Sequence, residues 1–202
     1  MPLSPQLIDR KTGERKYLNR EERRAFLEAT QQQEAKKKYY CQLLYYTGCR
    51  LSEALEVSYG QFNFDQGFVT FRTLKQGFDD DGQPVVRHRD NELPESYLNE
   101  IKGFYATVRG RRPHAKAAVE PLWPVSDRQA RNYVSDVMAV AGITGKKATS
   151  RGLRHSTGVM LALNKVPVTV IQRILGHRSA KNTLIYLDII EDERRELLTQ
   201  IW

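Results

Sequence analysis

The sequence predicts an α+β domain that is mostly helical and has one small antiparallel sheet. Apolar residues recur at helical spacing through most of the 202 residues, whereas the stretch that begins at Gln61 alternates as β-strands do. Capping boxes and glycine stops mark several helix ends. No internal repeat or linker divides the chain, so we expect one domain.

The first quarter of the chain contains a tail and three predicted helices. Residues 1–17 are polar and basic without periodicity, which predicts a flexible N-terminal tail. Asn19-Arg-Glu-Glu22 forms a capping box that opens a helix, and Gly48 is suited to the C-cap of another. The predicted helices span residues 19–33, 36–47 and 51–57.

The middle of the chain changes period from helical to alternating. Phe62, Phe64 and residues 68–74 alternate between apolar and polar, and residues 84–93 offer a return strand. The connector, residues 76–83, contains two glycines and three consecutive aspartates, as a solvated hairpin loop does. These segments predict the sheet.

The remaining elements are helices and one basic loop. Pro94 is tolerated in a first helical turn, Ser126-Asp-Arg-Gln129 is a second capping box, and Gly176 ends a helix. Residues 109–124 contain several basic residues among prolines and predict an exposed loop. The predicted helices span residues 94–108, 126–140, 150–164, 167–175, 179–187 and a C-terminal tail helix within 190–202.

Composition favours a polyanionic partner. Lys and Arg total 32 against 24 Asp and Glu, a net charge of +8 that suits nucleic acid first and a membrane surface second. No apolar run approaches the ~20 residues that span a bilayer, and no signal peptide is evident, which predicts a cytoplasmic protein. Cys41 and Cys49 form no CxxC pair, so neither a disulfide framework nor a zinc site is indicated.

Four motifs far apart in the sequence contain residues suited to chemistry. They are Gly48-Cys-Arg50-Leu-Ser-Glu53, Lys75 near a strand end, Arg151-Gly-Leu-Arg154-His155, and Leu175-Gly-His177 with Tyr186 nine residues later. Each alone has an ordinary structural explanation, such as a solvated arginine or a core tyrosine. Together, TGCRLSEAL, LKQ, RGLRHS and LGHRSAKNTLIYLDI resemble the tyrosine recombinase or phage integrase family, from about residue 18 to 187.

The resemblance implies a reaction with a protein nucleophile and no metal or cofactor. Cleaving a phosphodiester this way needs a nucleophile, positive charge for the phosphoryl oxygens and an acid for the leaving oxygen. The resemblance assigns Tyr186 as nucleophile and Lys75 as the acid for the 5′ oxygen. It assigns the phosphate contacts to Arg50, Arg154 and His177. Guanidinium groups suit this task because they bind phosphate oxygens in a bidentate fashion.

One position departs from the family pattern. Arg151 stands where the family usually has His or Lys, three residues before the second arginine, and an arginine cannot serve as a general base. His155 points about 100° away from Arg154 around the helix, so we expect it to pack structurally. Glu53, three residues after Arg50, resembles the acidic position that steadies the first arginine, although a surface glutamate is the alternative.

The resemblance also implies partners. Double-stranded DNA is the expected substrate, with self-assembly into dimers or tetramers on it and possible host DNA-bending proteins. Only the catalytic domain, residues 18–202, is expected, as in the reduced fimbrial phase-switching recombinases of bacterial, phage or plasmid origin. The alternatives are a DNA-binding protein with weak or lost cleavage and a type IB topoisomerase-like enzyme. Predicted DNA contacts are Arg87, Arg89, Arg111, Arg112, Lys146 and Lys147.

Overall fold

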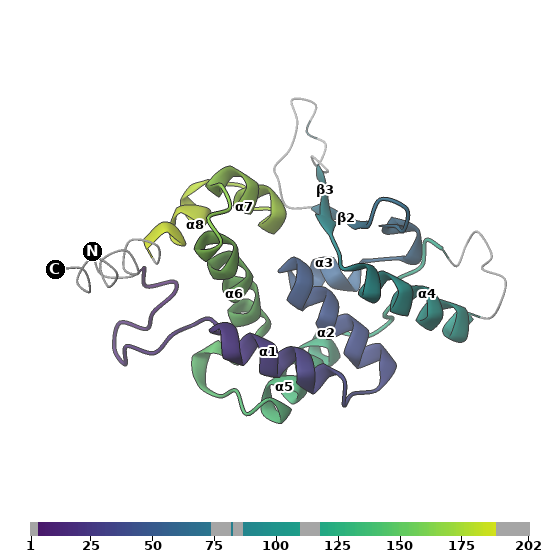
Figure 1. Cartoon of the computed structure of the whole chain (residues 1–202), viewed down its shortest axis with the longest axis horizontal. Coiled ribbons are helices and arrows are strands. Elements are labelled where there is room, and N and C mark those ends of the chain that lie inside the picture. Colours follow the sequence, from purple (N-terminus) through teal and green to yellow (C-terminus); the bar gives the residue numbers. More distant parts are fainter. Residues whose placement is uncertain (1–3, 74–81, 83–86, 110–117, 189–202) are drawn as a thin grey trace.

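The computed structural model describes residues 4–73, 82, 87–109 and 118–188 (Figure 1). Its helices are α1 (Arg20–Thr30), α2 (Ala35–Thr47), α3 (Leu51–Leu55), α4 (Glu95–Arg109), α5 (Asp127–Val140), α6 (Ser150–Leu163), α7 (Val168–Leu175) and α8 (Lys181–Leu184). The strands are β1 (Phe62–Asn63), β2 (Phe68–Thr73) and β3 (Arg87–Glu92), and two 3₁₀ turns span Tyr59–Gln61 and Gly145–Lys147. The predicted α+β class, mostly helical with a small antiparallel sheet, is confirmed.

The helix ends follow the local signals in the sequence. At α1, the Asn19 side chain accepts a 2.8 Å hydrogen bond from the Glu22 amide, and the Glu22 carboxylate accepts one from the Asn19 amide. Ser126 caps α5 in the same way, but the Gln129 side chain donates to the Tyr133 hydroxyl. Gly176 ends α7 with φ +62°, a left-handed conformation that glycine adopts without steric cost.

The sheet has the order β1-β2-β3 and is antiparallel throughout. In β2, Val69 and Phe71 are fully buried, and they pair with Asn91 and Arg89 of β3. The buried residues of β3, Arg89 and Asn91, are polar because both donate hydrogen bonds to the Ile174 carbonyl at the end of α7. Of the predicted connector and its flanks, residues 74–81 and 83–86 lie outside the described residues.

Two clusters of buried side chains form the interior. In Figure 1, the sheet and α4 lie on one side of α2 and α3, and α6 to α8 lie on the other. The larger cluster joins α1 to α5 with the sheet and includes Tyr40, Tyr97 and Trp123. The second cluster joins the N-terminal segment to α6, α7 and Tyr186, and it contains Leu7, Val159, Ala162, Ile171, Leu175 and Tyr186.

Two predicted loop regions are more ordered than expected. Residues 4–17 were expected to belong to a flexible tail, but Leu7 is fully buried and Ile8 pairs with Arg15 in a β-bridge. In the loop predicted to be exposed, Leu122 and Trp123 are buried, and the Trp123 ring lies edge-on to the Tyr40 ring. Isolated apolar side chains in polar segments give no periodicity, so the sequence pattern did not predict the burial of Leu7, Leu122 and Trp123. None of the described helices is both long and apolar enough to cross a bilayer.

Docking of the N-terminal segment can be measured with a truncation of its buried side chain. We expect Leu7→Ala to lower the free energy of unfolding by about 2–4 kcal/mol, because it removes fully buried methyl groups from the second cluster. Urea denaturation measures the change. The control is Val119→Ala, at a side chain that is 75% exposed, where we expect a change within about 0.5 kcal/mol. Equal, negligible effects from both variants would mean that the segment is not docked.

Candidate active site

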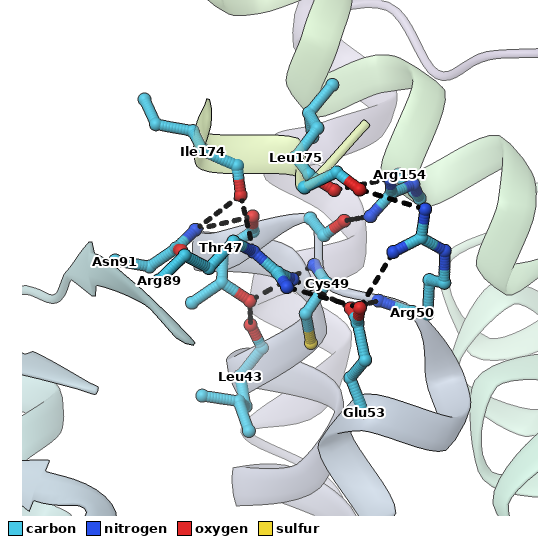
Figure 2. Close-up of polar contacts among 12 residues, drawn as sticks. Leu43, Thr47, Cys49, Arg50, Glu53, Arg89, Asn91, Arg154, Ile174 and Leu175 are labelled. Carbon is cyan, nitrogen blue, oxygen red and sulfur yellow. Dashed lines mark hydrogen bonds and ion pairs between the residues drawn. The ribbon is translucent and has the colours of Figure 1, made fainter. Parts of the chain in front are cut away.

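Three arginines converge on the end of α7. They lie on β3, on α6 and at the N-cap of α3, and they donate to three consecutive carbonyl groups (Figure 2). Arg89 Nε lies 3.1 Å from the Ile174 oxygen, Arg154 Nη2 lies 2.5 Å from the Leu175 oxygen, and Arg50 Nη2 lies 3.0 Å from the Gly176 oxygen. The last carbonyls of a helix lack partners within it and carry partial negative charge, so cations stabilise this end. The contacts fix the turn that leads into His177.

Glu53 supplies the negative charge that holds two of these arginines. Its carboxylate, 7% exposed, lies 2.7 Å from Nη1 of Arg50 and 2.7 Å from Nη2 of Arg89. It also accepts a hydrogen bond from the Arg50 amide at 2.7 Å. Burial raises the pKa of Glu53, but the hydrogen bond and charge of Arg89 and those of Arg50 outweigh burial and leave the pKa below its ordinary value.

Arg154 is tied to the interior by both ends of its guanidinium. Nη1 donates to the Gly48 carbonyl at 2.7 Å, so Arg154 links the end of α2 to the end of α7. Burial, with the nearby charge of Arg50, lowers its pKa to about 10, and it stays positively charged at neutral pH. Arg50 and Arg154 face one open cleft, whose lining also includes Arg151, His155, His177 and the ion pair of Arg131 with Asp127, so arginines predominate among its charged groups. Such a cleft favours an anion.

His177 and Tyr186 follow α7 and lie beside the arginines. Nδ1 of His177 lies 2.9 Å from the Thr183 hydroxyl, which fixes the ring. Burial, and then the charges of Arg154 and Arg50, lower the pKa of His177 to about 3, so the ring is neutral at pH 7. The His177 and Tyr186 rings are nearly parallel, with centroids 6.4 Å apart.

Tyr186 packs against α6 with its hydroxyl on a histidine. The residue is 1% exposed, and its hydroxyl oxygen lies 3.1 Å from Nδ1 of His155. Gly158, one turn further along α6, makes room for the ring, because a Cβ there would overlap Cζ of Tyr186. Burial raises the pKa of Tyr186 to about 12, and the Arg154 charge only partly opposes this.

The structure brings together most of the residues that the motifs nominated. Arg50, Glu53, Arg154, His177 and Tyr186 gather at the end of α7, and the exposed Arg151 lines the same cleft. Glu53 is buried and bonded to Arg50, so the alternative of a surface glutamate is wrong. Lys75, Arg111 and Arg112 lie outside the described residues.

The residues predicted to contact DNA differ in their exposure and in their ion pairs. Arg87 is exposed at the start of β3. Arg89 is 7% exposed and paired with Glu53, so the expectation that it faces DNA is corrected: the alternation of β3 turns it inward. Lys146 is paired with Asp9, and Lys147 lies 2.5 Å from Glu22, so both ammonium groups already have carboxylate partners.

Sequence reasoning missed the contact of His155 with Tyr186. The angle of about 100° that turns His155 away from Arg154 is the angle that turns it toward Tyr186, which packs on that side of α6. Gly158 was an available signal, because glycine inside a helix is unfavourable and often marks a close approach. Within the described part of the chain, no group of three or more His, Cys, Asp or Glu residues could hold a metal ion.

The fold is that of a tyrosine recombinase catalytic domain. The model of the phage integrase family matches residues 16–193, so the chain belongs to this family. It is 28% identical to tyrosine recombinase XerA of Pyrococcus furiosus over 90% of this chain and 60% of that protein. It is 27% identical to the type 1 fimbriae regulatory protein FimE of Escherichia coli K12, over 86% of each.

Solved structures agree on the fold. A XerH recombinase in a post-cleavage complex with palindromic difH substrate superposes with a TM-score of 0.74 at 21% identity, over 96% of this chain and 56% of that one. The XerA recombinase crystal structure gives a TM-score of 0.72 at 21% identity, over 95% of this chain and 65% of that one. The chain thus spans about two thirds or less of these recombinases.

Two glycines in helix interiors allow a matched test of how Tyr186 is seated. Gly158→Ala would force the Tyr186 ring out of its place, whereas a Cβ on Gly103 of α4 would meet no atom within 4 Å, so this position tolerates alanine. We expect Gly103→Ala to raise the free energy of unfolding by up to about 1 kcal/mol, and Gly158→Ala to lower it. Urea denaturation compares them, and stabilisation by both would contradict this packing.

Neutralising Glu53 tests the buried charge network. We expect Glu53→Gln to lower the free energy of unfolding at pH 7 by roughly 3–5 kcal/mol, because it breaks the buried ion pair between Glu53 and Arg89. A carboxylate with a lowered folded-state pKa stabilises the protein above its unfolded pKa near 4.5 and loses that effect as the pH falls further. The difference from the unmodified protein should therefore shrink below about pH 4.5. Glu92→Gln, at an exposed position of β3, is the control and should change little.

Proposed function

We propose that this protein is a site-specific DNA recombinase that cleaves and rejoins DNA through a 3′-phosphotyrosyl intermediate on Tyr186. The observation that best supports this is the shared anchoring of Arg50, Arg154 and the His177 turn on the end of α7, beside Tyr186. Two fixed guanidiniums and a neutral imidazole at one cleft suit the charge that grows on a phosphate under attack. Family membership supports the same reaction.

In the proposed reaction, the Tyr186 oxygen forms a bond to phosphorus while the bond from phosphorus to the 5′ oxygen breaks. Arg50 and Arg154 neutralise the non-bridging oxygens, and His177 donates a hydrogen bond to one of them. Lys75 is proposed to protonate the leaving 5′ oxygen. A 5′ hydroxyl from a second duplex then displaces the tyrosine, which gives recombination. Arg151 also lines the cleft and adds positive charge to it.

The proposed substrate is double-stranded DNA. The net charge of +8 supports it, and a structural neighbour, XerH, was solved bound to its difH substrate. Arg87, Arg111 and Arg112 are proposed as phosphate contacts. Lys146 and Lys147 are proposed to join them by exchanging their carboxylate partners, Asp9 and Glu22, for DNA phosphates. The protein is further proposed to act in the cytoplasm and to assemble into dimers or tetramers on DNA. DNA-bending proteins are its proposed partners.

A second candidate is specific DNA binding with little or no cleavage. Arg151 at the usual base position favours it, and so does Tyr186, which is 1% exposed with a raised pKa of about 12. A covalent adduct distinguishes the two candidates.

The test begins by finding the DNA site. The Tyr186→Phe variant selects bound duplexes from a random-sequence library, and a nicked version of the selected site is then offered to the unmodified protein. We expect a protein–DNA adduct on a denaturing gel. Tyr186→Phe should bind equally well and give no adduct, and Tyr59→Phe, a matched control at a ring stacked on Tyr105, should give the normal amount. Specific binding without adduct would favour the second candidate.

A further inference from the structure

We propose that His155 accepts the phenolic proton of Tyr186 when DNA is cleaved. This inference rests on the proposed function, because it concerns the same reaction at the same cleft. It gives the reaction a proton acceptor that Arg151 cannot provide, since a guanidinium does not give up its proton in proteins. His155 touches the reacting oxygen and is therefore a catalytic residue.

The geometry is that of a nucleophile and its base. Nδ1 of His155 lies 3.1 Å from the Tyr186 hydroxyl oxygen, within the reach required of a general base. Gly158, one turn after His155, lets the Tyr186 ring lie against α6, because a Cβ at this position would overlap the ring. His155 also lines the cleft with Arg50 and Arg154, so it adjoins both the hydroxyl and the space for phosphate.

His155 is in the right charge state to accept a proton. Burial, followed by the charges of Arg151, Arg154 and Lys16, lowers its pKa to about 4, so the imidazole is neutral at pH 7. A neutral ring with its proton on Nε2 has a lone pair on Nδ1, which then accepts the hydrogen bond from Tyr186. The other nearby imidazole, His177, already has Nδ1 engaged with the Thr183 hydroxyl.

The proposed proton transfer is coupled to attack on phosphorus. With a pKa of about 12 for Tyr186 and about 4 for His155, the proton stays on the phenol while no phosphate is present. As the bond from the Tyr186 oxygen to phosphorus forms, this oxygen loses electron density and its proton moves to Nδ1 of His155. The leaving 5′ oxygen takes a separate proton from the acid. In the rejoining step the bonds reverse, and His155 returns its proton to Tyr186. A phosphate in the cleft also offsets the cationic charges that depress the pKa of His155.

The first measurement needs no DNA. The chain has four histidines, so ¹⁵N NMR of the imidazoles can assign the protonated nitrogen of each ring. We expect neutral His155 to carry its proton on Nε2, and the Nδ1 resonance to shift when Tyr186 is replaced by Phe. A proton on Nδ1, or no response to Tyr186→Phe, would overturn the proposal without touching the proposed recombinase activity.

The second measurement is the rate of adduct formation in a single turnover on the selected duplex. His155→Asn keeps an oxygen acceptor close to the place of Nδ1 but cannot take up a proton. We expect it to slow adduct formation by ~100-fold or more, the usual range for loss of a general base, with DNA binding and melting temperature retained. His88→Asn, at an exposed histidine on β3, is the matched control and should keep the normal rate.

Two modified reactants separate proton acceptance from other roles. A duplex with sulfur as the bridging 5′ atom has a leaving group that needs no acid, so it should not rescue His155→Asn. Replacing Tyr186 by 3,5-difluorotyrosine, a more acidic phenol, should restore much of the lost rate. Rescue by sulfur, no rescue by the fluorinated phenol, or a His155→Asn rate within threefold of normal would each overturn the proposal. If the unmodified protein gave no adduct on either duplex, the proposed function itself would fail.

Discussion

Three consecutive carbonyl groups at the end of α7 require partners, and the site is built around that requirement. Arg89, Arg154 and Arg50 donate to the carbonyls of residues 174, 175 and 176 in turn (Figure 2). A helix end inside a protein is costly unless its carbonyls are bonded, and here the bonds come from charged groups of distant segments. The same contacts orient two guanidiniums toward the cleft and place the turn that precedes His177.

Three arginines close together in a partly buried site repel one another, and the carboxylate of Glu53 offsets this repulsion. It pairs with both Arg50, three residues before it, and Arg89 of β3. Arg89 thus has a positioning role, because it acts on the cleft through Glu53. The sheet matters to the site mainly through the buried polar face of β3, which delivers Arg89 and Asn91 to α7.

The same packing that anchors the C-terminal part of the domain also sets the state of Tyr186. Its ring belongs to the apolar cluster with Leu7 and Leu175, and its hydroxyl rests on His155. Burial makes the phenol a weaker acid, so the residue proposed as the nucleophile keeps its proton at neutral pH. The packing of this cluster therefore also sets the protonation state of Tyr186.

The local signals of the sequence predicted the helix ends and the three strands, and the family resemblance of four motifs nominated the residues that meet at α7. Capping at Asn19 and the stop at Gly176 depend on neighbours within one turn, and pattern alone reveals them. Tertiary structure alone decided that Arg89 is buried against Glu53, that Leu7 anchors its segment, and that His155 meets Tyr186. Each of these depends on what packs on a given face of an element. Periodicity states which face is apolar but does not state which distant residue covers it.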